Sequence, residues 1–200
     1  MSTNLSQLPE NLPVPVDDGA AARLEGSLLP DLALLKTDGA TIILADLKGQ
    51  WVIYIYPMTG RPDVPLPDGW DGVPGARGCT PQSCGFRDHY AELKALKTGV
   101  FGLSAQTTEY QREARDRLHL PFELLSDSSL KLKSALRLPT FNVAGMELFK
   151  RLTLVAENGR IKKVFYPVFP PDRNADEVLA WLRADAQPGA PEDSPQAMRP

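Results

Sequence analysis

The apolar run Trp-Val-Ile-Tyr-Ile-Tyr at residues 51–56 limits the choice of fold more than any other stretch of the sequence. It is aromatic and β-branched without a polar interruption, which is typical of a central strand buried on both faces of a sheet. The run Val-Phe-Gly-Leu-Ser-Ala at 100–105 predicts a second buried strand. A sheet that is buried on both faces needs covering layers above and below it, so these runs favour an α/β fold.

Shorter signals surround these two runs. The turn at 36–39 lies between two apolar segments and predicts a hairpin. Asn158-Gly159 between two apolar runs predicts another hairpin, because this dipeptide suits a two-residue turn. The order of elements indicates an α/β sandwich, with helices on a central mixed β-sheet. Helices are expected from just after Cys79 as far as Leu96, over 107–118 behind a capping box at Thr108 and Gln111, over 128–136, and after a cap formed by Asn174 and Glu177.

The chain divides into one domain and two loose ends. Its 200 residues are enough for one domain with a substantial core. We expect a flexible N-terminal segment at 1–18, a domain over 19–186 and a disordered tail at 187–200, because both ends are rich in proline. The stretch at about 58–76, rich in glycine and proline, is expected to be an insertion in the domain.

The charge pattern makes several partners poor candidates. The net charge is −3 and lysines and arginines form no block, so neither nucleic acid nor a membrane surface is an expected partner. No stretch approaches the 18 apolar residues of a membrane span. The first residues lack a basic region followed by an apolar run, so we expect a cytoplasmic protein without a secretory signal.

The two cysteines, Cys79 and Cys84, are the only ones in the chain. Two cysteines are too few for a disulfide scaffold, and a close pair in a protein without a signal peptide indicates redox or metal chemistry. The residues that follow, Phe86, Tyr90 and Leu93, have helical spacing and form one apolar stripe. The pair is therefore expected at the start of a helix.

The start of this helix favours a thiolate at Cys79. Thr80 is the expected N-cap and Pro81 the first helical residue, which puts the sulfur at the positive end of the helix dipole. Making an ordinary thiol mostly ionised at pH 7 requires about 3.4 kcal/mol. The dipole supplies only about 0.3–2 kcal/mol, so a cation is needed as well: Arg77, Arg87 or an arginine from elsewhere in the fold. The pattern indicates that Cys79 is a nucleophile.

The spacing of the cysteines predicts a conformational change. Positions five apart in an α-helix have Cα atoms roughly 8–9 Å apart, whereas a disulfide needs less than about 7 Å. Cys84, expected near the fourth helical position, can therefore bond to Cys79 only after the first turns unwind. Such a pair suits a two-step oxidation, in which a sulfenic acid forms on Cys79 and then condenses with Cys84.

The segment Cys-Thr-Pro-Gln-Ser-Cys-Gly-Phe-Arg-Asp at 79–88 resembles the peroxidatic helix of the bacterioferritin-comigratory, Q-type peroxiredoxins. Segments at 29–34, 49–57, 120–127 and 151–161 resemble the same family in the same order. The resemblance implies a thioredoxin-like fold and reduction of hydrogen peroxide or organic hydroperoxides, with a resolving cysteine five positions after the peroxidatic one. It implies a thioredoxin-like protein as reductant and no metal, haem or flavin, and we expect a monomer or a homodimer.

The resemblance also suggests which residues surround the sulfur. It implies an arginine at the start of a strand beside the peroxidatic cysteine, and Arg151 holds that position. Arg151 is therefore the expected cation for the thiolate and the peroxide. The candidate substrate-binding residues are Gly78, Thr80, Arg77 and Phe141.

Three features depart from the family pattern. A Thr or Ser three residues before the peroxidatic cysteine is replaced by Ala76, and a proline seven residues before it is replaced by Gly72. The missing hydroxyl normally helps to hold the thiolate and the peroxide; the candidates to replace it are Thr59, Thr80 and Arg77. The segment between Pro57 and Cys79 is also longer than in the family, and its Trp70 and Val73 suggest that part of it packs over the site.

Other functions stay open at this point. The two cysteines could be inert structural residues, or part of a metal site, although Cys-x4-Cys is not a zinc spacing and His89 and His119 are the only histidines. The same fold without strong peroxidase activity could act as a thiol–disulfide oxidoreductase or as a redox sensor. Peroxide consumption separates these alternatives from the peroxidase.

Overall fold

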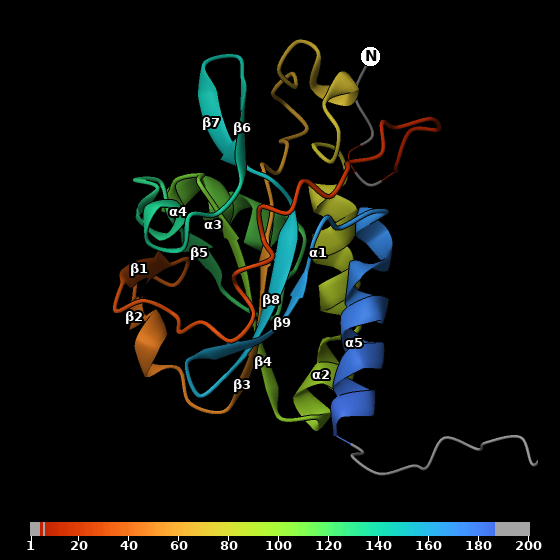
Figure 1. Ribbon diagram of the computed structural model, residues 1–200. Helices are drawn as coiled ribbons and strands as arrows, with labels where there is room; N and C mark the ends of the chain where they lie inside the picture. Colours follow the sequence, from red (N-terminus) through yellow and green to blue (C-terminus); the bar gives the residue numbers. More distant parts are fainter. Residues whose placement is uncertain (1–4, 6, 187–200) are drawn as a thin grey trace, which may run out of the picture.

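A seven-stranded mixed sheet forms the centre of the computed structural model, which describes Leu5 and residues 7–186. Its strand order is β2-β1-β5-β4-β3-β8-β9, and β3, β4 and β5 are mutually parallel while the other neighbours are antiparallel (Figure 1). The strands are β1 (Ala33–Lys36), β2 (Thr41–Ile43), β3 (Gln50–Ile55), β4 (Thr98–Ser104), β5 (Leu124–Ser126), β8 (Leu152–Glu157) and β9 (Arg160–Phe165), with a separate pair β6 (Thr140–Val143) and β7 (Met146–Phe149). The helices are α1 (Cys79–Asp88), α2 (Tyr90–Ala95), α3 (Thr108–Arg117), α4 (Lys131–Leu136) and α5 (Asn174–Asp185), with 3-10 turns η1 (Leu44–Asp46), η2 (Trp70–Gly72) and η3 (Pro171–Arg173).

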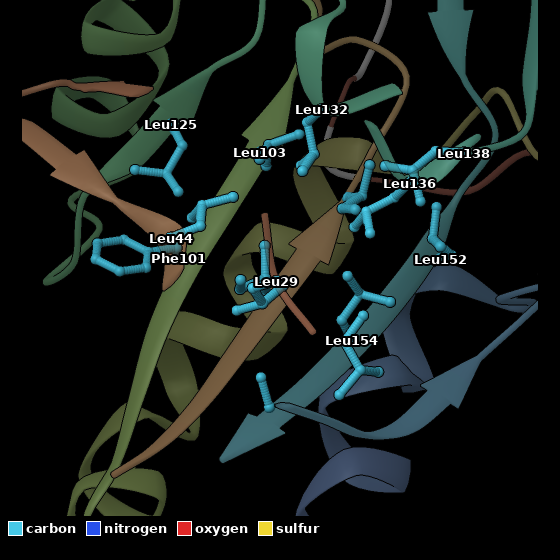
Figure 2. Close-up of a cluster of buried hydrophobic side chains, with 14 of the residues drawn as sticks. Leu29, Leu44, Phe101, Leu103, Leu125, Leu132, Leu136, Leu138, Leu152 and Leu154 are labelled. Atoms are coloured by element: carbon cyan, nitrogen blue, oxygen red, sulfur yellow. The ribbon is translucent and has the colours of Figure 1, made fainter. Parts of the chain in front are cut away.

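Strand β3 lies between β4 and β8 and is buried on both faces, as its sequence predicts. Val52 and Tyr54 point into a core shared with α1, α2 and α5. Ile53 and Ile55 point into the opposite core, which α4 covers and whose leucines Figure 2 shows. Successive strand residues face opposite sides, so one continuous apolar run supplies both cores. The predicted α/β fold with helices on a central mixed sheet is confirmed.

Both predicted hairpins are present, but the helices differ from the prediction in several ways; the helix expected over 128–136, for example, begins only at Lys131. The cap of α3 is the Thr107 hydroxyl, which accepts from Tyr110 N, and the proposed partner Gln111 is buried and binds Tyr56 instead. Asn174 is not a cap, because it is the first residue of α5 and its side chain faces the protein interior. The single helix expected from just after Cys79 as far as Leu96 is broken at His89 into α1 and α2, although its apolar stripe stays on one core.

The second sheet, the hairpin β6–β7, is not predicted by the sequence analysis. It turns at Ala144 and Gly145, both with positive φ, and stands apart from the main sheet (Figure 1). The insertion at 58–76 packs against it: the Trp70 and Phe141 rings are tilted at a centroid distance of 6.3 Å, and Trp70 is only 3% exposed. Part of the insertion therefore has its own small apolar core, shared with this hairpin.

The N-terminal segment has a defined path over most of its length. Leu5 and residues 7–18 lie along the domain, and the Asp18 carboxylate accepts from Lys150 Nζ at 2.7 Å and from the Tyr166 hydroxyl at 2.8 Å. The segment precedes the main sheet and passes the start of α1 (Figure 1). The predicted tail at 187–200 lies outside the described residues, and the domain boundaries stay a prediction.

Candidate active site

Cys79 is the first residue of α1, and the residue that precedes it, Gly78, is the N-cap. The Gly78 carbonyl accepts the first intrahelical bond, from Gln82 N at 3.0 Å. The expectation that Thr80 caps the helix and that Pro81 opens it is therefore wrong by two residues. Gly78 has a φ of +96°, which only glycine adopts readily, and this conformation lets the helix begin earlier. Pro81 still falls among the first residues, whose N–H groups have no partner within the helix.

The close packing around residue 78 also requires a glycine, because a side chain does not fit there. A Cβ atom added there would lie 2.2 Å from Pro171 Cγ and 2.8 Å from Leu8 Cδ2. The start of α1 is therefore held between the 3-10 turn η3 and the N-terminal segment, with no room for a side chain.

Arg151 contacts the Cys79 sulfur directly. Its Nη2 donates to Cys79 Sγ at 3.1 Å and also lies 3.0–3.2 Å from the carbonyl oxygens of residues 75, 76 and 77. Arg151 is 3% exposed and Cys79 4% exposed, so the pair is screened from bulk water. A buried guanidinium beside the helix N-terminus stabilises the thiolate form of a cysteine. The cation that the sequence analysis required thus lies next to the sulfur.

A buried chain of side-chain hydrogen bonds, which the sequence analysis missed, orients Arg151. Arg151 Nη1 donates to Gln82 Oε1, Gln82 Nε2 donates to Asn174 Oδ1 at 2.9 Å, and the Thr153 hydroxyl donates to the same oxygen at 2.7 Å. Gln82, Asn174 and Thr153 are all fully buried. One signal was available: Gln82 is three residues after Cys79 and thus on the same helix face. Asn174 and Thr153 carry no sequence signal, because only the packing of α5 and β8 brings them there.

Cys84 is the sixth residue of α1, not close to the fourth, because the helix starts earlier than expected. Both cysteines are free thiols in one unbroken helix, and the spacing argument against a direct bond therefore holds. Cys84 is partly exposed and packs at the margin of the core under α1. Burial raises the pKa of the Cys84 thiol, and the charge of Arg87 opposes this shift in part.

Ala76, which stands where the family has Thr or Ser, has no hydroxyl and contacts the Cys79 sulfur only through its backbone. Ala76 is fully buried, and its carbonyl oxygen lies 3.6 Å from Cys79 Sγ, within reach of the thiol proton. Thr59 donates its hydroxyl to Gln106 Oε1 at 3.0 Å. Arg77 is 7% exposed, and its Nε lies 3.3 Å from Asp71 Oδ1. Among the hydrogen bonds of the described residues, the Cys79 sulfur accepts one from Arg151 Nη2 and donates one, as a thiol, to the Ala76 carbonyl oxygen.

A cavity of about 20 Å³ lies beside Cys79, which is one of its lining residues. The predicted substrate-binding residues Gly78, Thr80 and Arg77 line it together with Cys79, so the fold brings these four together. Phe141 lies elsewhere: it lines a larger pocket of about 340 Å³ that includes Arg151 but not Cys79. Phe141 and Cys79 thus line different pockets.

Among the described residues, neither histidine forms a possible metal site with the two cysteines. His89 follows α1, and its two ring nitrogens lie 2.7 Å from Glu92 Oε1 and 2.8 Å from Asp176 Oδ1, so it joins α1 to α2 and α5. His119 is exposed, beyond the end of α3. Over Leu5 and residues 7–186, no group of three or more His, Cys, Asp or Glu residues could hold a metal ion.

Comparisons with known proteins agree with this geometry. Two curated relatives are named "Peroxiredoxin Q, chloroplastic": that of Suaeda salsa is 29% identical over 161 residues, 80% of this chain and 68% of the relative, and that of Gentiana triflora is 27% identical over 182 residues, 88% and 76%. The crystal structure of peroxidoxin BcpB from Mycobacterium tuberculosis matches with a TM-score of 0.65 and 24% identity over 80% of this chain and 96% of that chain. The structure of a PrxQ mutant from Xylella fastidiosa matches with a TM-score of 0.66 and 20% identity over 82% and 97%.

The fold and the relatives confirm the resemblance to Q-type peroxiredoxins. Within the described part of the chain, no helix is both long and apolar enough to cross a membrane. The relatives named here are chloroplastic, so the expected cytoplasmic location stays a prediction. The family model described as Redoxin matches residues 24–179, well over half of the sequence, and the chain therefore belongs to the Redoxin family.

Proposed function

We propose that this protein is a thiol peroxidase in which Cys79 is the peroxidatic and Cys84 the resolving cysteine. The observation that carries this proposal is the 3.1 Å contact between Arg151 Nη2 and Cys79 Sγ at the first residue of α1. A guanidinium and a helix N-terminus act on the same sulfur, and the second cysteine lies on the same helix. The names of the curated relatives support the same activity.

The first step is a nucleophilic displacement at oxygen. The Cys79 thiolate attacks the terminal oxygen of R–O–O–H, where R is hydrogen or an organic group, so that an S–O bond forms and the O–O bond breaks. The products are a sulfenic acid on Cys79 and RO⁻, which leaves as ROH after it takes up a proton. Negative charge moves from sulfur to oxygen during the step, and Arg151 and the free N–H groups of the first turn stabilise it.

The second step joins the two cysteines. The Cys84 thiolate attacks the sulfenic sulfur of Cys79, an S–S bond forms, and hydroxide leaves and is protonated to water. A dithiol protein of the thioredoxin kind then reduces the disulfide by thiol–disulfide exchange and is itself oxidised. A monomer or a homodimer in the cytoplasm fits this cycle, and no step in it needs a metal, haem or flavin.

Consumption of hydrogen peroxide with thioredoxin and its reductase tests the function. Wild-type protein should turn over continuously, and Cys79→Ser should lose turnover, because a hydroxyl does not replace the thiolate nucleophile. Cys84→Ser is the matched control: it should consume about one equivalent of peroxide per chain and then stop, because the sulfenic acid forms but is not resolved.

The same variants distinguish the alternatives. Insulin reduction without peroxide consumption would favour a thiol–disulfide oxidoreductase. A redox sensor would be oxidised once by peroxide and would support neither reaction. Retention of most of the peroxide turnover by Cys79→Ser would contradict the assignment of the nucleophile.

A further inference from the structure

The N-terminal segment covers the cysteine site. Leu5 and residues 7–18, which we call the strap, precede the part of the chain that matches the Redoxin family. Leu8 lies so close to the backbone beside Cys79 that its Cδ2 would be 2.8 Å from a Cβ atom on Gly78. Leu5 lies equally close to the insertion, since its Cδ2 would be 2.9 Å from a Cβ atom on Gly60.

The far end of the strap is fixed beside Arg151, in the short connection between β7 and β8. The Asp18 carboxylate binds Lys150, the neighbour of Arg151 in the sequence, and the Tyr166 hydroxyl. These two hydrogen bonds lower the pKa of Asp18 to about 2. The carboxylate is therefore ionised at any pH near neutrality, and the strap is held at Asp18 as well as at its leucines.

The strap lines a small cavity beside Cys79. This cavity of about 20 Å³ is lined by Leu5 of the strap, by Met58, Leu66 and Trp70 of the insertion, and by Cys79 itself. A cavity needs roughly 10–15 Å³ of this kind of volume to hold one water molecule. Hydrogen peroxide is only slightly larger than water, whereas a hydroperoxide with a bulky organic group, such as cumene hydroperoxide, is far larger than this space.

We propose that the strap is a size filter, which admits hydrogen peroxide to Cys79 and excludes hydroperoxides with a bulky organic group. Leu5 and Leu8 are the specificity-determining residues, because Leu5 lines the cavity beside Cys79 and Leu8 lies against Gly78, which lines it too. The inference rests on the proposed peroxidase function and specifies its substrate. It adds no chemical step, because the displacement at oxygen is the same for every R group.

The test compares two oxidants in the full-length chain. Stopped-flow measurements give the second-order rate constants of Cys79 oxidation by hydrogen peroxide and by cumene hydroperoxide. In the double variant Leu5→Ala/Leu8→Ala, the ratio of the cumene to the hydrogen peroxide rate constant should rise by about tenfold or more, as expected when a steric exclusion is relieved. Val16→Ala is the matched control: Val16 belongs to the strap but is 81% exposed, so its truncation should leave the ratio unchanged.

A second measurement needs no peroxidase activity. In a Cys84→Ser background, Cys79 is alkylated with iodoacetamide or with the larger N-phenylmaleimide. The double variant should accelerate the maleimide reaction by about tenfold relative to the iodoacetamide reaction, for the same steric reason. If the double variant does not fold, as judged by circular dichroism, Leu8→Ala alone should change both ratios in the same direction.

The outcomes separate the two proposals. If neither peroxide oxidises the wild-type protein but the alkylation ratio rises in the double variant, the peroxidase function fails and the filter stands. If both ratios in the double variant equal those of the wild type, the filter is refuted, whether or not the protein is a peroxidase. A wild-type protein that reacts equally fast with both peroxides also refutes it.

Discussion

The two sulfurs lie on one helix in different surroundings. Cys79 is 4% exposed, at the helix start, with Arg151 at 3.1 Å and a chain of buried hydrogen bonds behind that arginine. Cys84 lies five residues later, half-buried at the margin of an apolar core. Burial raises the pKa of the Cys84 thiol. In the folded reduced state a guanidinium therefore lies against the Cys79 sulfur, whereas burial opposes ionisation of Cys84.

This difference separates the two steps of the proposed cycle. The surroundings of Cys79 are complete before any oxidant arrives, so the first step needs no rearrangement of α1. Cys84 lacks both a stabilised thiolate and access to its partner while α1 is intact. Unwinding supplies both, because it exposes the thiol to water and frees the backbone between the cysteines. The site is therefore organised for the reaction with peroxide, and resolution depends on local unfolding.

Removal of Arg151 should affect the first step most strongly. In Arg151→Ala, the rate of Cys79 oxidation by hydrogen peroxide should fall by about 10²–10³-fold, the usual cost of losing a donor to a developing anion. Arg151→Lys, the matched control, should recover part of the rate, because it keeps the charge but not the planar group that binds Gln82 and the sulfur together. Stopped-flow oxidation in a Cys84→Ser background measures the first step alone.

Equal rates in Arg151→Ala and in the wild type would remove the basis for the difference between the two sulfurs. The Cys79 thiolate would then depend on the helix N-terminus alone. A fall of equal size in Arg151→Ala and Arg151→Lys would indicate that geometry, rather than charge, is the contribution of the arginine.

Formation of the disulfide should unwind α1. Loss of one turn removes about four backbone hydrogen bonds, at about 1 kcal/mol each, and exposure of part of the fully buried Phe86 adds roughly 1–2 kcal/mol. The oxidised protein should therefore be less stable to urea than the reduced protein by a few kcal/mol, less any gain from loop closure. Hydrogen exchange at the amides of residues 82–87 should be slow in the reduced protein and fast in the oxidised protein.

Cys84→Ser treated with peroxide is the control for unwinding. It forms no intramolecular disulfide, so the amides of residues 82–87 should stay protected. A disulfide within one chain together with protected amides would show that the spacing argument is wrong. Disulfides found only between chains would exclude Cys84 as the intramolecular resolving residue.

Replacement of Gly78 should destabilise the folded protein at the Cys79 end of α1, although Cys79 itself is unchanged. In Gly78→Ala, the positive φ costs roughly 1–2 kcal/mol, and the overlap with Pro171 adds about 1–3 kcal/mol. Urea unfolding should detect a loss of this size. Gly85→Ala is a control on the same helix, because the nearest side-chain atom to its added Cβ, on Ala175, lies at 3.5 Å. Equal stability of the two variants would contradict the tight packing at Gly78.

The far end of α1 should show a smaller effect that depends on pH. Hydrogen bonds and charges from Glu92 and Asp176 raise the pKa of His89. Protonated His89 therefore favours the folded state: this contribution is fully present below the unfolded pKa of about 6.5 and is lost as the pH rises through the raised folded value. His89→Gln should be less stable than the wild type by about 0.5–1 kcal/mol at pH 5.5 and by less at pH 8.5.

Urea unfolding of His89→Gln and the wild type at the two pH values measures this difference. Arg173 and Arg183 also bind Asp176 and Glu92, so these carboxylates keep partners in the variant. A difference in stability that grows with pH would contradict the proposed charge on His89.

Several features of the fold follow from local sequence because a local cause is sufficient for each. The run at 51–56 predicts a strand that is buried on both faces, because a strand with one exposed face would alternate apolar and polar residues. Asn158 and Gly159 predict their hairpin because both adopt positive φ readily. The helix starts were less predictable: Thr107, Gly78 and Arg173 hold positions that other polar residues nearby also suited.

The surroundings of the sulfur were only partly predictable. Cys79 at a helix start follows from the sequence, and Arg151 came from a family resemblance. Gln82, Asn174 and Thr153 could not be recognised, because a buried amide or hydroxyl looks like an exposed one until its partners are known. The hairpin β6–β7 and its contact with Trp70 also escaped prediction, because both segments gain their stability from each other.

By itself, the sequence determined that two cysteines share one helix, that the first lies at its positive end, and that they cannot bond without unwinding. These are consequences of helix geometry, which depends on neighbouring residues along the chain. Tertiary structure alone decided which cation meets the sulfur, how that cation is oriented, and how much space remains above it. Those properties arise where β8, α5, the insertion and the strap meet, and side chains far apart in sequence acquire defined distances only when the sheet and its helices pack.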